Sequence, residues 1–138
     1  MSALEDFLAI RRVVGLWESR GDAEIGAVHG LGLSDFAALR CLAEAPGHRL
    51  RRIDLAQRLG FTASGVTRLL GPLERRRIIT REESGHDARA TYAVLTRSGL
   101  ELVKNTSETM NAFAEAILGS LTERDRVAIA KLSKSVVS

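Results

Sequence analysis

Along most of the chain, apolar residues recur every three or four positions, the spacing of amphipathic helices. This pattern predicts helices over residues 3–20, 35–45, 52–59, 62–77, 96–118 and 122–136. Four glycines between residues 21 and 33 are expected to loosen or break the first helix. The sequence therefore predicts a mainly α-helical protein.

Polar residues that favour helix starts stand just before several of these segments. Ser34, Thr62 and Thr96 suit the N-cap position, because a side-chain oxygen there accepts a hydrogen bond from a free backbone N–H group. Thr122 and Asp125 have the spacing of a capping box. These residues fix the predicted starts of four helices.

Two short segments have the composition of β-strands. Residues 78–84 (IITREES) and 90–96 (ATYAVLT) are separated by GHDAR and predict a hairpin, with Gly85 and Asp87 suited to its turn. Two helices followed by such a hairpin form a winged helix-turn-helix, which places a helix in the DNA major groove and the hairpin tip in the minor groove. Arg89 is the candidate for the minor-groove contact. Asp87 is expected to cap the turn or to hold an arginine in place.

The segment 62–77 (TASGVTRLLGPLERRR) has two different faces. At about 100° per residue, one stripe is apolar and is expected to be buried: Val66, Leu69, Leu70 and Leu73. The opposite face is small, hydroxylic and cationic: Ser64, Arg68, Gly71 and Arg75, with Thr67 at its edge. Such a face can approach DNA closely and donate hydrogen bonds to it.

Gly71 and Pro72 are unusual inside a recognition helix. Gly71 lies on the outer stripe, where the lack of a side chain leaves clearance for a sugar-phosphate backbone. Pro72 removes the hydrogen bond to the Arg68 carbonyl, so a kink is expected there. The alternative is that the helix ends before Pro72, which leaves the same residues exposed.

The basic residues are concentrated in the middle third of the chain. The net charge is only +3, but the segment from His48 to Arg97 holds eleven arginines, no lysine and five acidic residues. The two flanks together hold nine basic and twelve acidic residues. Arginine binds phosphates and guanine edges in a bidentate manner, so this distribution favours a polyanion partner. The alternative is a solvated surface without a partner.

The size and composition fit one domain, residues 1–138, with 45% apolar residues to build its core. No apolar run reaches the roughly 18 residues that span a bilayer, and the start MSALEDFLAIRR lacks the pattern of a signal peptide. A single cysteine, Cys41, cannot form an internal disulfide, which agrees with a reducing compartment. We therefore expect a cytoplasmic protein with no membrane partner.

Residues 31–99 resemble the MarR family of bacterial transcriptional regulators. The resemblance rests on the leucine-rich helix, the ASGVTRLL segment, the D-x-R wing and the LT..G exit. It implies a winged helix-turn-helix over residues 34–97, flanked by dimerisation helices over residues 1–30 and 98–138. It further implies a homodimeric repressor that binds double-stranded DNA at a pseudo-palindromic operator. Release follows when a small, often aromatic effector enters a pocket between the dimerisation and DNA-binding regions.

The resemblance also assigns roles to residues by position. In the recognition helix it implies base or phosphate contacts for Ala63, Ser64, Thr67 and Arg68. In the wing it implies the pair Asp87 and Arg89, with Ala88 where many relatives carry another arginine. From their charge we add Arg75 on the outer helix face, and Arg51 and Arg52 as candidate phosphate contacts.

The flanking helices predict a dimer independently of this resemblance. Both C-terminal helices and residues 3–20 have apolar stripes that the winged unit is too small to cover, and a second copy of the chain is the economical partner. A dimer would also place two recognition helices about 34 Å apart, in successive major grooves. The alternative is a monomer that folds these helices onto its own core.

Other kinds of site find little support. His29, His48 and His86 are far apart and lack partners at metal-ligand spacing, so neither a metal nor a cofactor is expected. Cys41 is expected to be a small core residue rather than a redox sensor. A winged helix for protein contacts would need an apolar or acidic outer face, and an enzyme would need a nucleophile with a base or paired carboxylates. The sequence favours a DNA-binding regulator that is not an enzyme.

Overall fold

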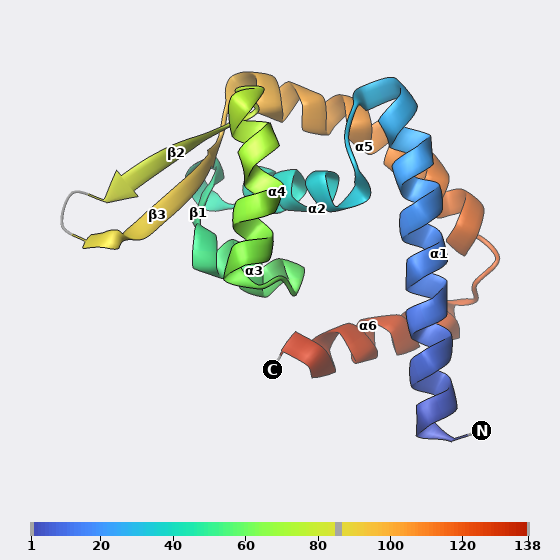
Figure 1. Cartoon of the computed structure of the whole chain (residues 1–138). Coiled ribbons are helices and arrows are strands. Elements are labelled where there is room, and N and C mark those ends of the chain that lie inside the picture. The colour runs from blue at the N-terminus through green and yellow to red at the C-terminus, as the bar shows by residue number, and fades with distance from the viewer. Residues whose placement is uncertain (1, 85–86, 138) are drawn as a thin grey trace.

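The computed structural model describes residues 2–84 and 87–137, without the side chains of residues 84–90 and 137. Its elements in chain order are α1 (Ala3–His29), α2 (Leu33–Glu44), a 3₁₀ turn (Pro46–His48), β1 (Arg49–Arg51), α3 (Arg52–Leu59), α4 (Ala63–Arg75), β2 (Ile79–Ser84), β3 (Asp87–Leu95), α5 (Arg97–Leu118) and α6 (Glu123–Val137). Figure 1 shows the hairpin β2–β3 at one side and α1 at the other, with α2, α3 and α4 between them. The predicted fold class, helical with a small sheet in a winged arrangement, is confirmed.

Helix α1 continues to His29, so the predicted break among its glycines is wrong. Gly21 is buried, and Leu33 Cδ2 lies 3.1 Å from the point where a β-carbon would stand. The glycine therefore lets α1 and the start of α2 approach closely, and this packing outweighs the roughly 1 kcal/mol by which glycine weakens a helix. The helix ends at Gly30, whose φ of 66° is the left-handed conformation that glycine adopts freely.

Helix α2 begins at Leu33, so the predicted N-cap Ser34 lies inside its first turn. Gly32 takes the N-cap position, and its N–H donates to Asp35 Oδ2 at 2.8 Å. The carboxylate of Asp35 replaces the cap that we expected from the Ser34 hydroxyl. Helix α3, in contrast, occupies its predicted range.

One hydrophobic core joins α1, α2, α3, α4 and the start of α5. Its largest fully buried apolar side chains are Ile25, Leu39, Leu42, Leu55, Val66, Leu70, Leu73 and Ile79. Most of these residues belong to the predicted apolar stripes. The core therefore fixes the position of α4 through one face and leaves its other face free.

The sheet has three strands in the order β1-β3-β2, and both pairs are antiparallel. The hairpin was predicted, but β1 was not. Leu50 pairs with Ala93, and Ala93 pairs on its other side with Arg81. Strand β3 begins at Asp87, so the predicted turn residue Asp87 belongs to the strand and lies opposite Ser84; Gly85 lies outside the described residues.

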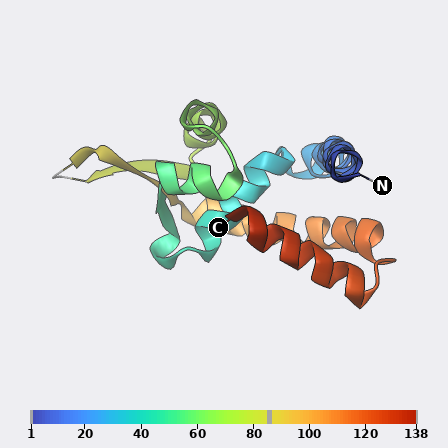
Figure 2. The same ribbon diagram turned by 90° about the horizontal axis from the view of Figure 1, so that it is seen from below.

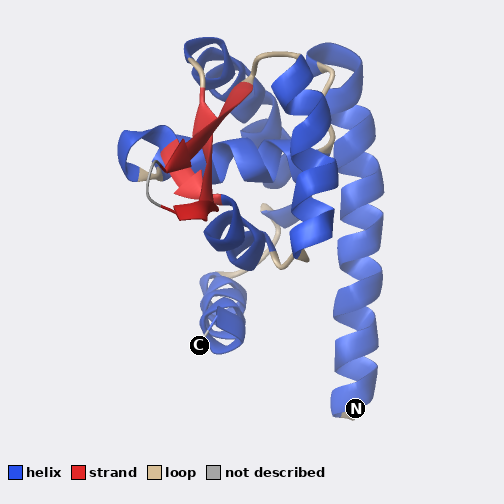
Figure 3. Ribbon diagram, turned by 60° about the vertical axis from the view of Figure 1, so that its left-hand side comes forward, coloured by secondary structure: helices blue, strands red, loops and turns tan. Residues whose placement is uncertain are grey.

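Helices α5 and α6 begin at their predicted caps. Thr96 Oγ1 accepts from the Gly99 N–H at 3.1 Å, and Thr122 and Asp125 form the expected reciprocal pair at 2.9 and 3.2 Å. Figure 3 shows that the N-terminal half of α1 and helix α6 extend away from the winged region. Within the described residues, no helix combines the length and apolar character needed to cross a bilayer.

Candidate nucleic-acid interface

Helix α4 begins at Ala63, with Thr62 as its N-cap, and runs through Pro72 to Arg75, so the alternative of an early end is wrong. Thr62 Oγ1 accepts from the Gly65 N–H at 3.0 Å, which anchors the first turn. Val66, Leu70 and Leu73 are buried, as predicted. In Figure 2 the helix is seen end-on at the outer side of α3. The kink at Pro72 stays a prediction.

The outer face of α4 presents the predicted contact residues to solvent: Ala63, Ser64, Thr67, Arg68 and Arg75. Among the described residues, neither Arg68 nor Arg75 forms an ion pair with a carboxylate. Arg75 Nη1 lies 3.5 Å from the position that a β-carbon of Gly71 would take, so this guanidinium lies over the glycine. The guanidinium groups of these two arginines are therefore available to a partner outside the chain.

A groove of about 670 Å³ runs beside the N-terminal half of α4. Helices α3 and α4 and the sheet all contribute to its walls: Arg51, Arg52, Ile53, Ala56, Gln57, Phe61, Ala63, Val66, Thr67, Arg81 and Thr91. It brings four predicted residues together, two from α4 and two from the start of α3. Gln57, Arg81 and the exposed Ile53 were missed, because their place in the groove depends on how α3 and the sheet pack against α4.

Arg51 and Arg52 have different surroundings, although they are neighbours in sequence. Arg51 is exposed, and its Nε donates to the Tyr92 hydroxyl at 3.5 Å. Arg52 Nη1 donates to Glu74 Oε1 at 3.3 Å, and the Arg52 side chain is only 17% exposed. This ion pair joins the start of α3 to the end of α4, so Arg52 helps to set the angle between the two helices.

The predicted wing residues Asp87 and Arg89 lie in β3, and their side chains are outside the described part of the structure. Closer to the body of the protein, the Arg49 guanidinium stacks on the Tyr92 ring at 4.1 Å and Arg49 Nη1 donates to Glu82 at 3.0 Å. Arg81 Nη2 lies 3.7 Å from Glu83 Oε1. Arg49 on β1 and Arg81 on β2 therefore each lie close to an acidic residue of β2.

The C-terminal end of α4 is tied to other elements through backbone carbonyls. Arg76 Nη1 donates to the Gly30 carbonyl at 2.8 Å, which joins α4 to the end of α1. Arg77 has a φ of 57°, and its carbonyl accepts from Thr96 Oγ1 at 2.8 Å. These bonds hold the recognition helix between the long helix α1 and the start of α5.

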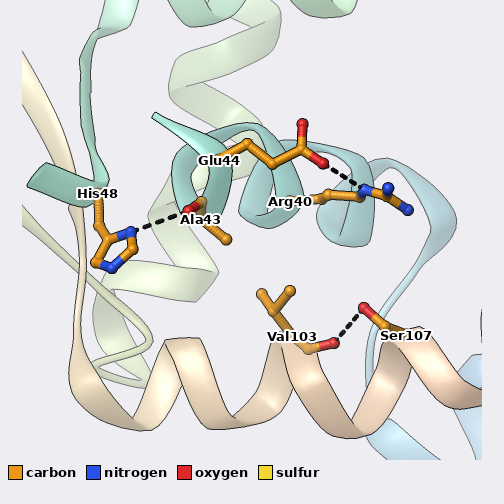
Figure 4. A network of polar contacts seen from close by, with 6 residues as sticks. All are labelled: Arg40, Ala43, Glu44, His48, Val103 and Ser107. Carbon is orange, nitrogen blue, oxygen red and sulfur yellow. Dashed lines mark hydrogen bonds and ion pairs between the residues drawn. The ribbon is translucent and has the colours of Figure 1, made fainter. Parts of the chain in front are cut away.

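Other candidate groups are occupied by structural contacts. His29 Nε2 pairs with Thr109 Oγ1 at 2.8 Å, joining α1 to α5. Figure 4 shows His48 Nδ1 beside the Ala43 carbonyl at 3.0 Å, close to the exposed ion pair Arg40–Glu44. Burial raises the pKa of the Cys41 thiol, and the nearby Arg58 opposes this only partly. In the described residues, no cluster of three or more His, Cys, Asp or Glu side chains is placed to hold a metal.

A second cavity of about 250 Å³ lies between α1, α2 and the α3–α4 connection. Its lining residues come from these elements: Glu18, Leu33, Ser34, Ala37, Leu59 and Phe61. The cavity is mostly apolar, with one carboxylate and one hydroxyl at its wall. It therefore lies between the long flanking helix and the winged region.

Comparison with known proteins agrees with the winged geometry. Residues 29–90 match the family model described as MarR family. The chain is 25% identical over 116 residues to the HTH-type transcriptional regulator PrsX of Escherichia coli, covering 84% of this chain and 70% of the relative. It is 24% identical over 109 residues to the transcriptional repressor MprA of Escherichia coli K12, covering 79% and 62%.

Similarity extends to the whole fold in a solved structure. Sco3205, a MarR family transcriptional regulator from Streptomyces coelicolor solved in complex with DNA, superimposes with a TM-score of 0.84 at 25% identity. The match covers 99% of this chain and 87% of that one. The resemblance to the MarR family is thus confirmed over residues 29–90, and the named relatives are transcriptional regulators.

Proposed function

We propose that this chain, a MarR-family transcriptional regulator, is a homodimeric repressor that binds a pseudo-palindromic operator and leaves it when a small molecule binds. The observation that carries the DNA contact is the exposed outer face of α4, where Arg68 and Arg75 have no carboxylate partner among the described residues. Ala63, Ser64, Thr67 and Arg68 would meet base edges in the major groove. Gly71 would leave clearance for the backbone beside them.

The elements around α4 would contact the DNA backbone. Arg51 and Arg52 stand at the start of α3, with Arg52 serving also as the partner of Glu74. Arg75 would reach a phosphate from the last turn of α4. Arg89 would enter the minor groove from β3, and Asp87 would hold it or cap the strand start.

The second copy would cover the apolar surface of α1 and α6. Seven apolar side chains in the N-terminal half of α1 and four in α6 are exposed, each by more than a third: Leu4, Phe7, Leu8, Ile10, Val13, Val14 and Leu16, and Val127, Ile129, Leu132 and Val136. Soluble monomers rarely expose an apolar surface of this extent. Because both helices carry such stripes, two copies related by a twofold axis can bury them mutually. This assigns residues 1–30 and 98–138 to dimerisation and residues 34–97 to DNA binding.

The effector would enter the 250 Å³ cavity between α1, α2 and the α3–α4 connection. The side chains of Phe61 and Leu33 would supply apolar contacts to a small aromatic molecule there. A repressor role agrees with the name of MprA, and action on DNA inside a bacterial cell implies a cytoplasmic location.

The DNA-binding proposal is tested by fluorescence anisotropy with a duplex from the protein's own upstream intergenic region and a scrambled duplex, at two salt concentrations. We expect tight binding to the first duplex only, and weakening by salt because bound arginines release counterions. Arg68→Ala should cost about 1–3 kcal/mol for the specific duplex, whereas Arg89→Ala should weaken both duplexes more evenly. Normal operator binding by both folded, dimeric variants would refute the site assignment. Equal weak binding of the parent to both duplexes would instead favour a winged helix for protein contacts.

The dimer is tested by sedimentation equilibrium of Leu132→Asp against the parent. Leu132 is an exposed apolar residue of α6, and an aspartate there would face the partner's apolar surface. Ile53→Asp is the matched control, because Ile53 is also an exposed apolar residue but lies in α3 at the groove. We expect Leu132→Asp to be monomeric at concentrations where Ile53→Asp and the parent are dimeric. A monomeric parent would refute the dimer.

A further inference from the structure

The hydroxyl group of Thr67 is hydrogen-bonded to the backbone of its own helix. Thr67 Oγ1 donates its hydrogen to the Ala63 carbonyl one turn earlier, at 3.1 Å. This bond uses the only hydrogen of the hydroxyl, and back-bonding to the i−4 carbonyl is a common arrangement for threonine in a helix. The hydroxyl can then only accept a hydrogen bond, and the methyl group is the other part of the exposed side chain that remains for a partner.

The neighbours of Thr67 on the outer face of α4 offer one further methyl group and two polar groups. Ala63, one turn earlier, is exposed and offers only a methyl group. Ser64, in contrast, makes no bond to a carbonyl of its own helix, and its Oγ lies 3.3 Å from Thr62 Oγ1. Arg68 is exposed and has no carboxylate partner within the described residues. Two methyl groups thus stand beside a hydroxyl and a guanidinium.

In the major groove, each of these groups matches a different base feature. Methyl groups contact the 5-methyl group of thymine, and arginine binds guanine O6 and N7. We infer that Thr67 identifies a thymine in each operator half-site through its methyl group and not through its hydroxyl. The inference rests on the proposed function, because it requires α4 to lie in the major groove. It assigns Thr67 a role in specificity.

The test separates the methyl group from the hydroxyl on both molecules. The parent protein first selects its preferred duplex from a random library. Its affinity is then measured for duplexes in which each thymine in turn, in both half-sites, is replaced by deoxyuridine, which lacks the 5-methyl group. Thr67→Val keeps the methyl group and loses the hydroxyl, whereas Thr67→Ser does the reverse. Thr80→Ser is the matched control, since Thr80 is exposed on β2 and outside the lining of the groove.

We expect one thymine position at which deoxyuridine weakens parent binding by about fourfold for each half-site, the effect of one buried methyl group. Thr67→Val should behave like the parent. Thr67→Ser should bind the thymine duplex about fourfold more weakly for each half-site and should no longer distinguish thymine from deoxyuridine at that position. Thr80→Ser should match the parent throughout.

Two results would overturn the inference alone. One is a loss of specific binding in Thr67→Val with normal binding in Thr67→Ser, which would show that the hydroxyl reads the base. The other is a specific duplex whose binding is insensitive to both substitutions and to every deoxyuridine. Failure of the parent to enrich any sequence would instead refute the proposed function, and the inference with it.

Discussion

Replacing Gly71 by alanine should change the stability of the protein only slightly and weaken its binding to the operator. Gly71 lies in the interior of α4, where glycine costs about 0.5–1 kcal/mol relative to alanine. Beyond its chain neighbours, the new β-carbon would meet Arg75 Nη1 at an ordinary contact distance of 3.5 Å. Because Gly71 precedes Pro72, however, a β-carbon also crowds the proline Cδ in a helical backbone, which opposes the gain. The free energy of unfolding should therefore change by less than about 1 kcal/mol, or less than roughly 4 °C in Tm.

The same methyl group would fill the clearance that α4 needs on DNA. If Gly71 faces the sugar-phosphate backbone closely, one added carbon should cost about 1–3 kcal/mol at each helix, by analogy with an overpacked interior. This corresponds to roughly a 5- to 150-fold weaker affinity for each half-site. Thermal unfolding at matched protomer concentration measures the first effect, and anisotropy with the operator duplex measures the second. A folded variant with parental operator affinity would refute the clearance argument, because the added carbon would then meet no DNA.

Three other substitutions or treatments follow from local geometry. Gly99→Ala should lower the free energy of unfolding, measured in denaturant, by about 2 kcal/mol or more, because its β-carbon would overlap the Ile78 carbonyl and Leu95. A neutral effect would contradict the close packing of α5 on these two residues. Arg77→Gly should raise the free energy of unfolding by about 0.5–1 kcal/mol, since φ of 57° strains any residue with a β-carbon; a loss of stability would mean that the arginine side chain contributes more than this strain. The raised pKa of Cys41 should make its reaction with a disulfide reagent near pH 7 slower than that of free cysteine and faster as pH rises toward that pKa; a faster reaction than free cysteine at pH 7 would contradict the burial argument.

The parts of the fold that the sequence predicted depend on local signals. In α4, the apolar stripe and the N-cap Thr62 lie within one segment, and both are present in the structure. The same holds for Thr96 and for the pair Thr122 and Asp125, whose partners are three residues away. Caps and helical periodicity need only neighbouring residues, so a single sequence is enough to find them.

The parts that it did not predict depend on contacts between distant residues. Strand β1 has three residues and exists through its pairing with β3, about forty positions later. The continuation of α1 through Gly21 depends on Leu33, which belongs to the next helix. Likewise the charge of Arg52 suggests a phosphate contact, whereas its pairing with Glu74 becomes visible only when α3 and α4 are packed. The spacing of residues along the chain carries no signal for such contacts.

The bond from Arg76 to the Gly30 carbonyl has a mechanical consequence. It joins the C-terminal end of α4 to the C-terminal end of α1, a helix of 27 residues. A tilt of α1 would therefore move Gly30, and the bond from Arg76 would carry that movement to α4. A molecule bound between α1 and α2 would therefore change the orientation of α4 without contacting the outer face that we propose for DNA binding.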